Sequence, residues 1–147
     1  MTALVPPPNA RRVIAGLERA GIAVLVVTNS DGHAAENLRD ASICQVGPGP
    51  GVAVTDVIDS AVVGSEKPDP EIFRTALARV GLEPTEPTSV VHVGDMIRTD
   101  IAGARAAGIV PIHFDPRRAC RAPDHRHVCS LNGIWRHVSG EPSRRPR

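Results

Sequence analysis

Four side chains that suit phosphate chemistry follow apolar stretches of this sequence. Thr28 comes at the end of one apolar run, Lys67 follows a second, and Asp95 comes directly after Val-Val-His-Val-Gly. Asp100 follows Asp95 by five residues. A hydroxyl and an ammonium group can bind phosphoryl oxygens, and a pair of carboxylates suits a hard cation such as Mg²⁺. The residue types therefore predict a metal-assisted phosphate site.

The elements that must position these groups alternate between strand-like and helical patterns. Continuous apolar runs indicate buried strands, and apolar residues repeated every three or four positions, bounded by Gly or Pro, indicate helices. We expect strands at 22–27, 57–63, 89–93 and 109–114, and helices at 10–20, 33–40, 70–80 and 99–107. This alternation predicts a three-layer, Rossmann-like α/β fold with about four parallel strands and helices on both faces.

Parallel strands bring the candidate groups to one edge of the sheet. Ligands of open α/β sheets bind beyond the carboxyl ends of the strands, and Thr28, Lys67 and Asp95 each follow a predicted strand. The backbone N–H groups of Asn29 and Ser30 are expected to complete an anion-binding turn. Each signal alone is common in turns and helix caps, but the three in this order indicate a shared site.

Composition limits the class of protein. The 147 residues suit one domain, and a net charge of +1 gives no electrostatic basis for binding nucleic acid or an anionic membrane. No apolar run is long enough for a membrane span, and no signal peptide is evident, so we expect a cytoplasmic protein. We divide the chain into a Pro-rich segment at 1–8, a core at 9–138 and a disordered basic tail at 139–147.

A second group of candidate ligands lies late in the chain. Cys120, His125, His127 and Cys129 are four soft or borderline ligands within ten residues, a number that could hold Zn²⁺. Their spacing matches none of the usual zinc-ligand patterns, and we expect His125 and His127 to point to opposite sides of an extended segment. The odd total of three cysteines instead favours reduced thiols.

The sequence resembles the haloacid dehalogenase-like hydrolase superfamily over roughly residues 9–116. The strand ending in Thr28 is similar to the family's second motif, Lys67 in Glu-Lys-Pro-Asp-Pro-Glu-Ile-Phe to the third, and Gly-Asp95 with Asp100 to the fourth. The resemblance implies that Thr28 and Asn29 bind phosphate, that Lys67 binds phosphate and neutralises charge in catalysis, and that Asp95 and Asp100 bind magnesium. It also implies a small phosphorylated metabolite as substrate.

One part of the family pattern does not occur in the sequence. Family members open with an apolar strand carrying Asp-x-Asp, whose first Asp attacks phosphorus, and no two of the aspartates here are spaced in that way. The cap that selects substrate has no counterpart either. We therefore expect the carboxyl-terminal part of such a hydrolase, truncated or inactive as it stands. In the family the missing strand lies between those ending near Val27 and Val93, so these should flank a vacancy or pair directly.

Two functions follow from this pattern. The first is a magnesium-dependent phosphatase acting on a small phosphomonoester, with the nucleophile not supplied by these residues. The alternative is a non-catalytic module that binds phosphate or Mg²⁺ through the same groups. Turnover of an aryl phosphate would distinguish the phosphatase from the module.

Overall fold

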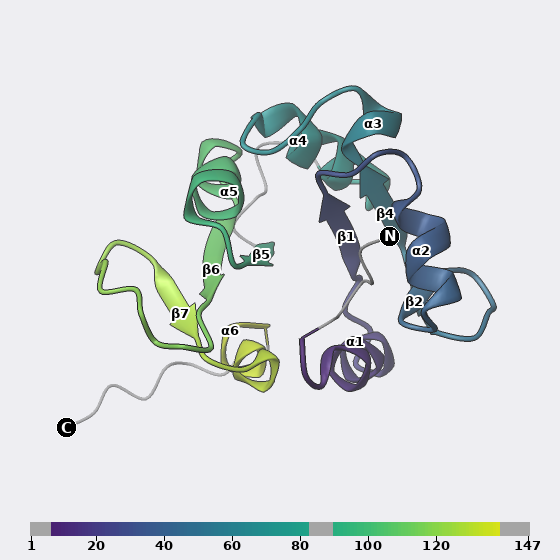
Figure 1. The fold of residues 1–147 in the computed structure, drawn as a ribbon, viewed down its shortest axis with the longest axis horizontal. Helices are drawn as coiled ribbons and strands as arrows, with labels where there is room; N and C mark the ends of the chain where they lie inside the picture. The colour runs from purple at the N-terminus through teal and green to yellow at the C-terminus, as the bar shows by residue number, and fades with distance from the viewer. Residues whose placement is uncertain (1–6, 83–89, 139–147) are drawn as a thin grey trace.

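A computed structural model describes residues 7–82 and 90–138 of the chain. Strands and helices alternate along most of this length, as the sequence patterns predict (Figure 1). The strands are β1 Leu25–Thr28, β2 Cys44–Val46, β3 Val52–Val54, β4 Asp56–Asp59, β5 Val91–Gly94, β6 Val110–Phe114 and β7 Arg126–Val128. The helices are α1 Ala10–Arg19, α2 Ala34–Asp40, α3 Ser60–Val63, α4 Pro70–Arg79, the π-helical turn η2 Ile97–Ile101, α5 Ala102–Ala106, the 3₁₀ turn η3 Leu131–Ile134 and α6 Trp135–Val138.

The main strands form two parallel groups. β1 pairs with β4, and Thr28 lies opposite Asp59 at the carboxyl ends of the two strands. β5, β6 and β7 form the second group, in that order and also parallel. A small parallel pair, β2 and β3, completes the strands of the described residues. The predicted α/β class with parallel strands is confirmed.

Three of the four predicted strands are present, with carboxyl ends at or within one residue of those expected and starts one to three residues later. The second predicted strand was partly wrong. The apolar run 57–63 divides into β4 and the short helix α3. Asp59 causes the change, because its carboxylate accepts the N–H of Ala61 (3.0 Å) and caps the first turn of α3. The short strands β2, β3 and β7 were not predicted. In β7, Arg126-His127-Val128 has no apolar pattern of its own and depends on pairing with β6.

An apolar cleft of about 430 Å³ separates the two groups of strands. Its walls include residues 24–27 in and just before β1 and residues 90–93 in and just before β5; the two strands are not paired with each other. Helix α1, with η3 and α6, closes one side, and α4 closes the other. Figure 1 shows β1 and β5 facing each other across the middle of the molecule. Of the two arrangements expected for these strands, the structure has the vacancy rather than direct pairing.

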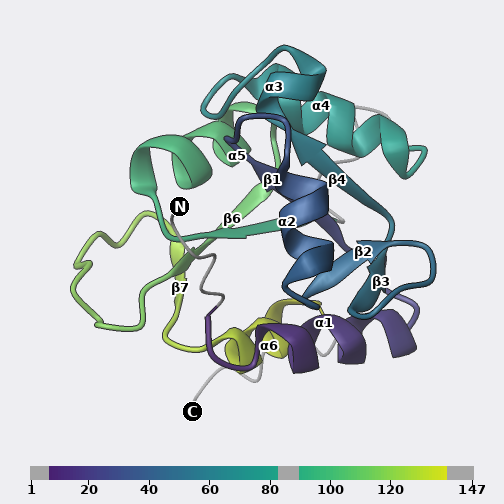
Figure 2. The ribbon, with the colours of Figure 1, turned by 45° about the vertical axis from the view of Figure 1, so that its right-hand side comes forward.

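The buried apolar side chains form three clusters, one of them around Ile43, Cys44 and Val54 at β2 and β3. The other two contain helices on either side of the strands. On one side Phe73 and Leu77 of α4 pack with Ile58 and with the inward side chains of β1. On the other side Val13 and Leu17 of α1 pack against η3 and α6 near Trp135, and Figure 2 shows α1 and α6 side by side. Two helical layers around parallel strands form the predicted three-layer arrangement.

Two predictions about the ends of the chain cannot be compared with the structure. The basic tail at 139–147 and most of the segment at 1–8 lie outside the described residues. Within the described ranges, no helix is both long enough and apolar enough to cross a bilayer.

Candidate functional site

The Lys67 ammonium group is bonded to Asp100 at the carboxyl ends of the strands. Lys67 Nζ lies 2.6 Å from Asp100 Oδ1, and only 11% and 6% of the two side chains is exposed. Lys67 is the only lysine among the 147 residues. Because a buried ammonium group is costly without a partner, Asp100 fixes the position of this cation.

Asp100 has two further hydrogen-bond donors. His92 Nε2 lies 3.0 Å from Asp100 Oδ1, and the Met96 backbone N–H donates to Oδ2 at 3.1 Å. A carboxylate only accepts, so His92 carries its proton on Nε2. Burial raises the pKa of Asp100, but the hydrogen bonds from His92 and Lys67 outweigh it and hold this pKa well below its ordinary value of 3.8. Asp100 is therefore an anion throughout the neutral range.

The close fit of Asp100 depends on Gly94. A Cβ atom at position 94 would lie 2.4 Å or less from Asp100 Cβ and Cγ. Glycine is thus required where the end of β5 touches the π-helical turn η2 that carries Asp100. Gly103 has a similar role in α5, where a Cβ would meet Phe73 and Pro68 at about 3 Å. The lack of a side chain at Gly103 lets Pro68, next to Lys67, pack closely against α5.

The loop after β1 is bonded to the same lysine segment. Asn29 Nδ2 donates to the Lys67 carbonyl (2.9 Å), and Asn29 Oδ1 accepts the Lys67 N–H (2.8 Å). The Asn29 side chain therefore positions the lysine, a role that the sequence did not predict. The Ser30 N–H already donates to Ser60 Oγ (2.9 Å), so it would have to leave this bond to join an anion-binding turn. Thr28 is half-buried at the end of β1.

A buried carboxylate that the sequence reasoning set aside organises this loop. Asp59 is 3% exposed and accepts the N–H groups of Gly32 and Ala34 at 3.0–3.1 Å in addition to that of Ala61. Its sequence signal is an acidic residue at the end of an apolar strand, and His92 gives a similar signal as a polar residue inside one. The hydrogen-bond partners of Asp59 and His92 lie elsewhere in the sequence. The sequence can therefore single out these two residues but cannot show what they bind.

The two predicted metal-binding carboxylates have different surroundings. Asp95 is exposed, and its side chain makes no hydrogen bond within residues 7–82 and 90–138. Both oxygens of Asp100 are already bonded. Magnesium takes oxygen ligands, binds through one or two carboxylates and keeps several waters. This donor set fits Mg²⁺, for which the exposed Asp95 would be the available ligand and the already bonded Asp100 would act less directly.

A continuous chain of hydrogen bonds thus joins three loops. It runs from Asn29 after β1, through Lys67 after α3, to Asp100 in η2 and the Met96 N–H beside Asp95. The structure brings the predicted phosphate-binding and carboxylate residues together at one edge of the strands. In chemical terms, this edge offers a hydroxyl, a fixed ammonium group and an exposed carboxylate.

The chain is similar in sequence to known hydrolases. The family model described as haloacid dehalogenase-like hydrolase matches residues 2–108. A phosphoserine phosphatase of Thermus thermophilus is 34% identical over 108 residues, covering 74% of this chain and 40% of that protein. A glyceraldehyde 3-phosphate phosphatase of Methanopyrus kandleri is 38% identical over 77 residues, covering 47% of this chain and 32% of that protein. The chain thus spans less than half the length of these relatives.

A solved structure supports the same fold. The crystal structure of a HAD phosphatase from Thermococcus onnurineus superimposes with a TM-score of 0.72 at 23% identity, covering 91% of this chain and 58% of that one. At that identity the likeness concerns the fold. The family model, which matches more than half of the residues, shows that this chain belongs to the haloacid dehalogenase-like hydrolases.

Proposed function

We propose that the chain carries the phosphate- and magnesium-binding part of a phosphomonoester hydrolase site, without the carboxylate nucleophile. The observation that supports this most directly is the hydrogen-bonded chain from Asn29 through Lys67 to Asp100. It places a fixed cation between the end of β1 and the end of β5, where a phosphoryl group would meet Thr28. The relatives named as phosphatases point to small phosphorylated metabolites as the substrate class.

Each residue has a definite task in this proposal. The Thr28 hydroxyl and the Asn29 N–H donate to phosphoryl oxygens, and the Lys67 ammonium group neutralises the phosphate charge. Asp100 and the Asn29 side chain hold Lys67 in place. Asp95, with Asp100 behind it, would hold Mg²⁺, which supplies Lewis-acid stabilisation of phosphate charge when bound. Preorganised charges of this kind act in the transition state because they need no reorganisation.

The nucleophile is the missing component. An aspartyl nucleophile divides hydrolysis into two easier displacements, and a neighbouring acid protonates the leaving group. The 147 residues contain no Asp-x-Asp. Asp59 is fully engaged by backbone N–H groups, and the exposed Asp31 accepts the His33 N–H in the loop after β1. We infer that the chain alone binds phosphate without efficient turnover.

Titration calorimetry with inorganic phosphate and Mg²⁺ tests the binding half of the proposal. We expect Lys67→Met to weaken phosphate binding and Asp95→Asn to abolish its dependence on Mg²⁺. The matched controls are Arg74→Met and Asp40→Asn, which change exposed residues of α4 and α2. Equal affinities for Lys67→Met and Arg74→Met would contradict the proposal.

The alternative function, a module that only binds, is favoured by the same lack of Asp-x-Asp. A synthetic apolar strand peptide carrying Asp-x-Asp separates the two. The cleft between β1 and β5 has the right lining to receive such a strand, and an added carboxylate should restore some Mg²⁺-dependent turnover if the site is a phosphatase site. A binding module would stay inert with the peptide bound.

A further inference from the structure

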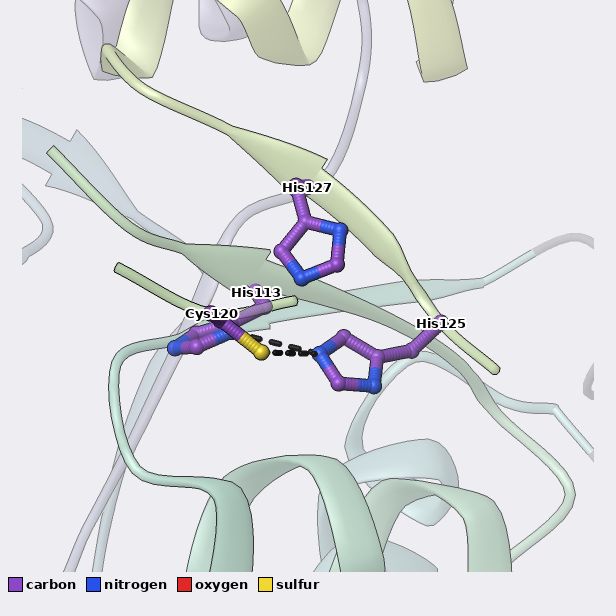
Figure 3. Close-up of side chains that lie close together, drawn as sticks. All are labelled: His113, Cys120, His125 and His127. Carbon is purple, nitrogen blue, oxygen red and sulfur yellow. Dashed lines mark hydrogen bonds between the residues drawn. The ribbon is translucent and has the colours of Figure 1, made fainter. Parts of the chain in front are cut away.

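A second cluster of ligand-type side chains lies beyond the phosphate site, at the edge formed by β6 and β7. One ligand atom each from His113, Cys120, His125 and His127 lies within 4.8 Å of the others. Figure 3 shows the thiol and the three rings gathered around a common space. His113 belongs to β6 and Cys120 to the following loop. His125 directly precedes β7, and His127 is the central residue of β7.

The pairing of β6 with β7 explains this convergence. His113 and His127 are directly opposed in the parallel register, and residues opposed across two strands point to the same face. Residues two apart along an extended segment also share a face. The expectation that His125 and His127 point apart was therefore wrong: their ring centroids lie 4.4 Å apart. His113 takes the place expected for Cys129, which is exposed and outside the cluster.

Two of the distances within the cluster match those that a tetrahedral zinc ion requires. Zinc–nitrogen and zinc–sulfur bonds of about 2.05 and 2.3 Å place two nitrogens about 3.3 Å apart, and a nitrogen and a sulfur about 3.6 Å apart. His125 Nε2 lies 3.2 Å from His113 Nδ1 and 3.6 Å from Cys120 Sγ.

Outer hydrogen bonds turn the ring lone pairs toward the centre. His113 Nε2 faces the Asp95 carbonyl at 3.2 Å, and His125 Nδ1 faces the Asp124 carboxylate at 2.8 Å. Both oxygens only accept, so these outer nitrogens carry the protons. The lone pairs of His113 Nδ1 and His125 Nε2 then face each other at 3.2 Å, an arrangement that a cation between them would stabilise. Zinc-binding histidines have this outer partner in most sites.

A third nitrogen lacks any partner. The Nε2 atom of His127 is shielded from solvent and makes no hydrogen bond within the described residues. A proton on one ring would satisfy the contact between His113 and His125 but would leave the buried His127 Nε2 unpaired within the described residues. A single zinc ion would satisfy all four ligand atoms at once.

The loop that carries the thiol is also held in place. Asp115 is 9% exposed, and its carboxylate accepts the N–H groups of Ala119 (3.1 Å) and Cys120 (2.8 Å). Arg105 of α5 holds Asp124 from the other side, with Nη1 3.3 Å from Oδ2. The ligands therefore sit on two paired strands and a braced loop, which is the support that a structural metal site needs.

We propose that His113, Cys120, His125 and His127 bind a structural zinc ion. One thiolate and three neutral imidazoles form a closed four-ligand set suited to zinc. The ion would fasten residues 115–125 to the edge of β6 and β7. Through the bond from His113 to the Asp95 carbonyl, it would also support the loop of the phosphate site.

Metal content and cobalt spectroscopy of the 147-residue chain test this proposal. After loading with Zn²⁺ and desalting, we expect about one zinc per chain, as in a four-ligand structural site. Co²⁺ added to the metal-free chain should give intense tetrahedral d–d bands and a thiolate charge-transfer band, both removed by Zn²⁺. Cys120→Ser should lose the charge-transfer band, while the matched control Cys129→Ser should keep it.

The histidine variants provide a second comparison. His127→Asn should weaken zinc binding by more than the 10–100-fold typical for loss of an outer partner, while the control His137→Asn in α6 should leave it unchanged. Weak octahedral cobalt bands in the unaltered chain would overturn the proposal, whether or not the variants fold. So would zinc retention by Cys120→Ser equal to that of Cys129→Ser, with circular dichroism showing both folded.

Discussion

The ion pair of Lys67 and Asp100 should couple strongly in a double-mutant cycle. Both side chains are almost fully buried, and their charged atoms lie 2.6 Å apart. Breaking a buried pair by removing one partner costs about 3–5 kcal/mol. Lys67→Met leaves Asp100 with its bonds from His92 and Met96, so we expect about 3 kcal/mol for this variant, the lower end of that range.

The reverse change leaves the cation without its anion. Asp100→Asn keeps the shape of the side chain but removes the charge beside Lys67, and we expect a loss of about 3 kcal/mol here as well. The double variant should lose about 4 kcal/mol, because the second change removes a charge that has already lost its partner. The coupling energy would then be about 2 kcal/mol, within the range seen for contacting residues.

Urea unfolding followed by circular dichroism measures all three differences, without added magnesium. The control cycle uses Glu71→Gln and Arg74→Met, an exposed pair on α4 with 60% and 44% of the side chains exposed. Such a surface pair should couple by only about 0.3–0.5 kcal/mol. If the effects of the Lys67 and Asp100 variants are additive within the error of the control cycle, Asp100 does not fix the position of the Lys67 ammonium group.

Three further results are expected. Because the pKa of Asp100 is lowered from 3.8, the ionised carboxylate contributes its full stabilisation above pH 3.8 and loses it as the pH falls below that value. In urea unfolding, the stability of Asp100→Asn should therefore fall less with acid than that of the unaltered chain. An equal fall in both proteins would contradict the lowered pKa. Gly94→Ala should destabilise by about 1–3 kcal/mol, because its Cβ would overlap Asp100, whereas a loss below about 0.5 kcal/mol would exclude that overlap. Amide hydrogen exchange should be slowest in β6, which is paired on both edges, and faster at alternate residues of β1 and β5, whose inner edges face the cleft; uniform protection would contradict the vacancy.

The parts of the fold that were predictable from sequence are those governed by local patterns. β1, β5 and β6 are apolar runs ended by turn residues, so the local sequence pattern was enough to predict where each strand ends. The error at residues 57–63 arose because Asp59 caps a helix there, using bonds to residues 25–27 positions away as well. β7 is a strand only because β6 provides its hydrogen bonds, and no local signal records that.

The candidate sites show the same division. Residue types and spacing led to Lys67 and Asp100, but not to the way that Asn29 and His92 hold them, because those bonds join segments 8 to 38 residues apart. The Cys/His cluster was underestimated for a similar reason. Its fourth ligand, His113, comes from a strand twelve residues before His125, and only the register of β6 and β7 reveals it.

The most direct test of the account is turnover of an aryl phosphate by the purified 147-residue chain with Mg²⁺, measured alongside phosphate binding. We expect phosphate to bind and to shift the signal of the single lysine, Lys67, in a lysine-labelled NMR spectrum. The turnover number should fall far below the range typical of enzymes, which is roughly 1–10³ per second. Magnesium-dependent turnover within that range, abolished by Asp95→Asn, would contradict the account and would identify Asp31 or another carboxylate of this chain as the nucleophile.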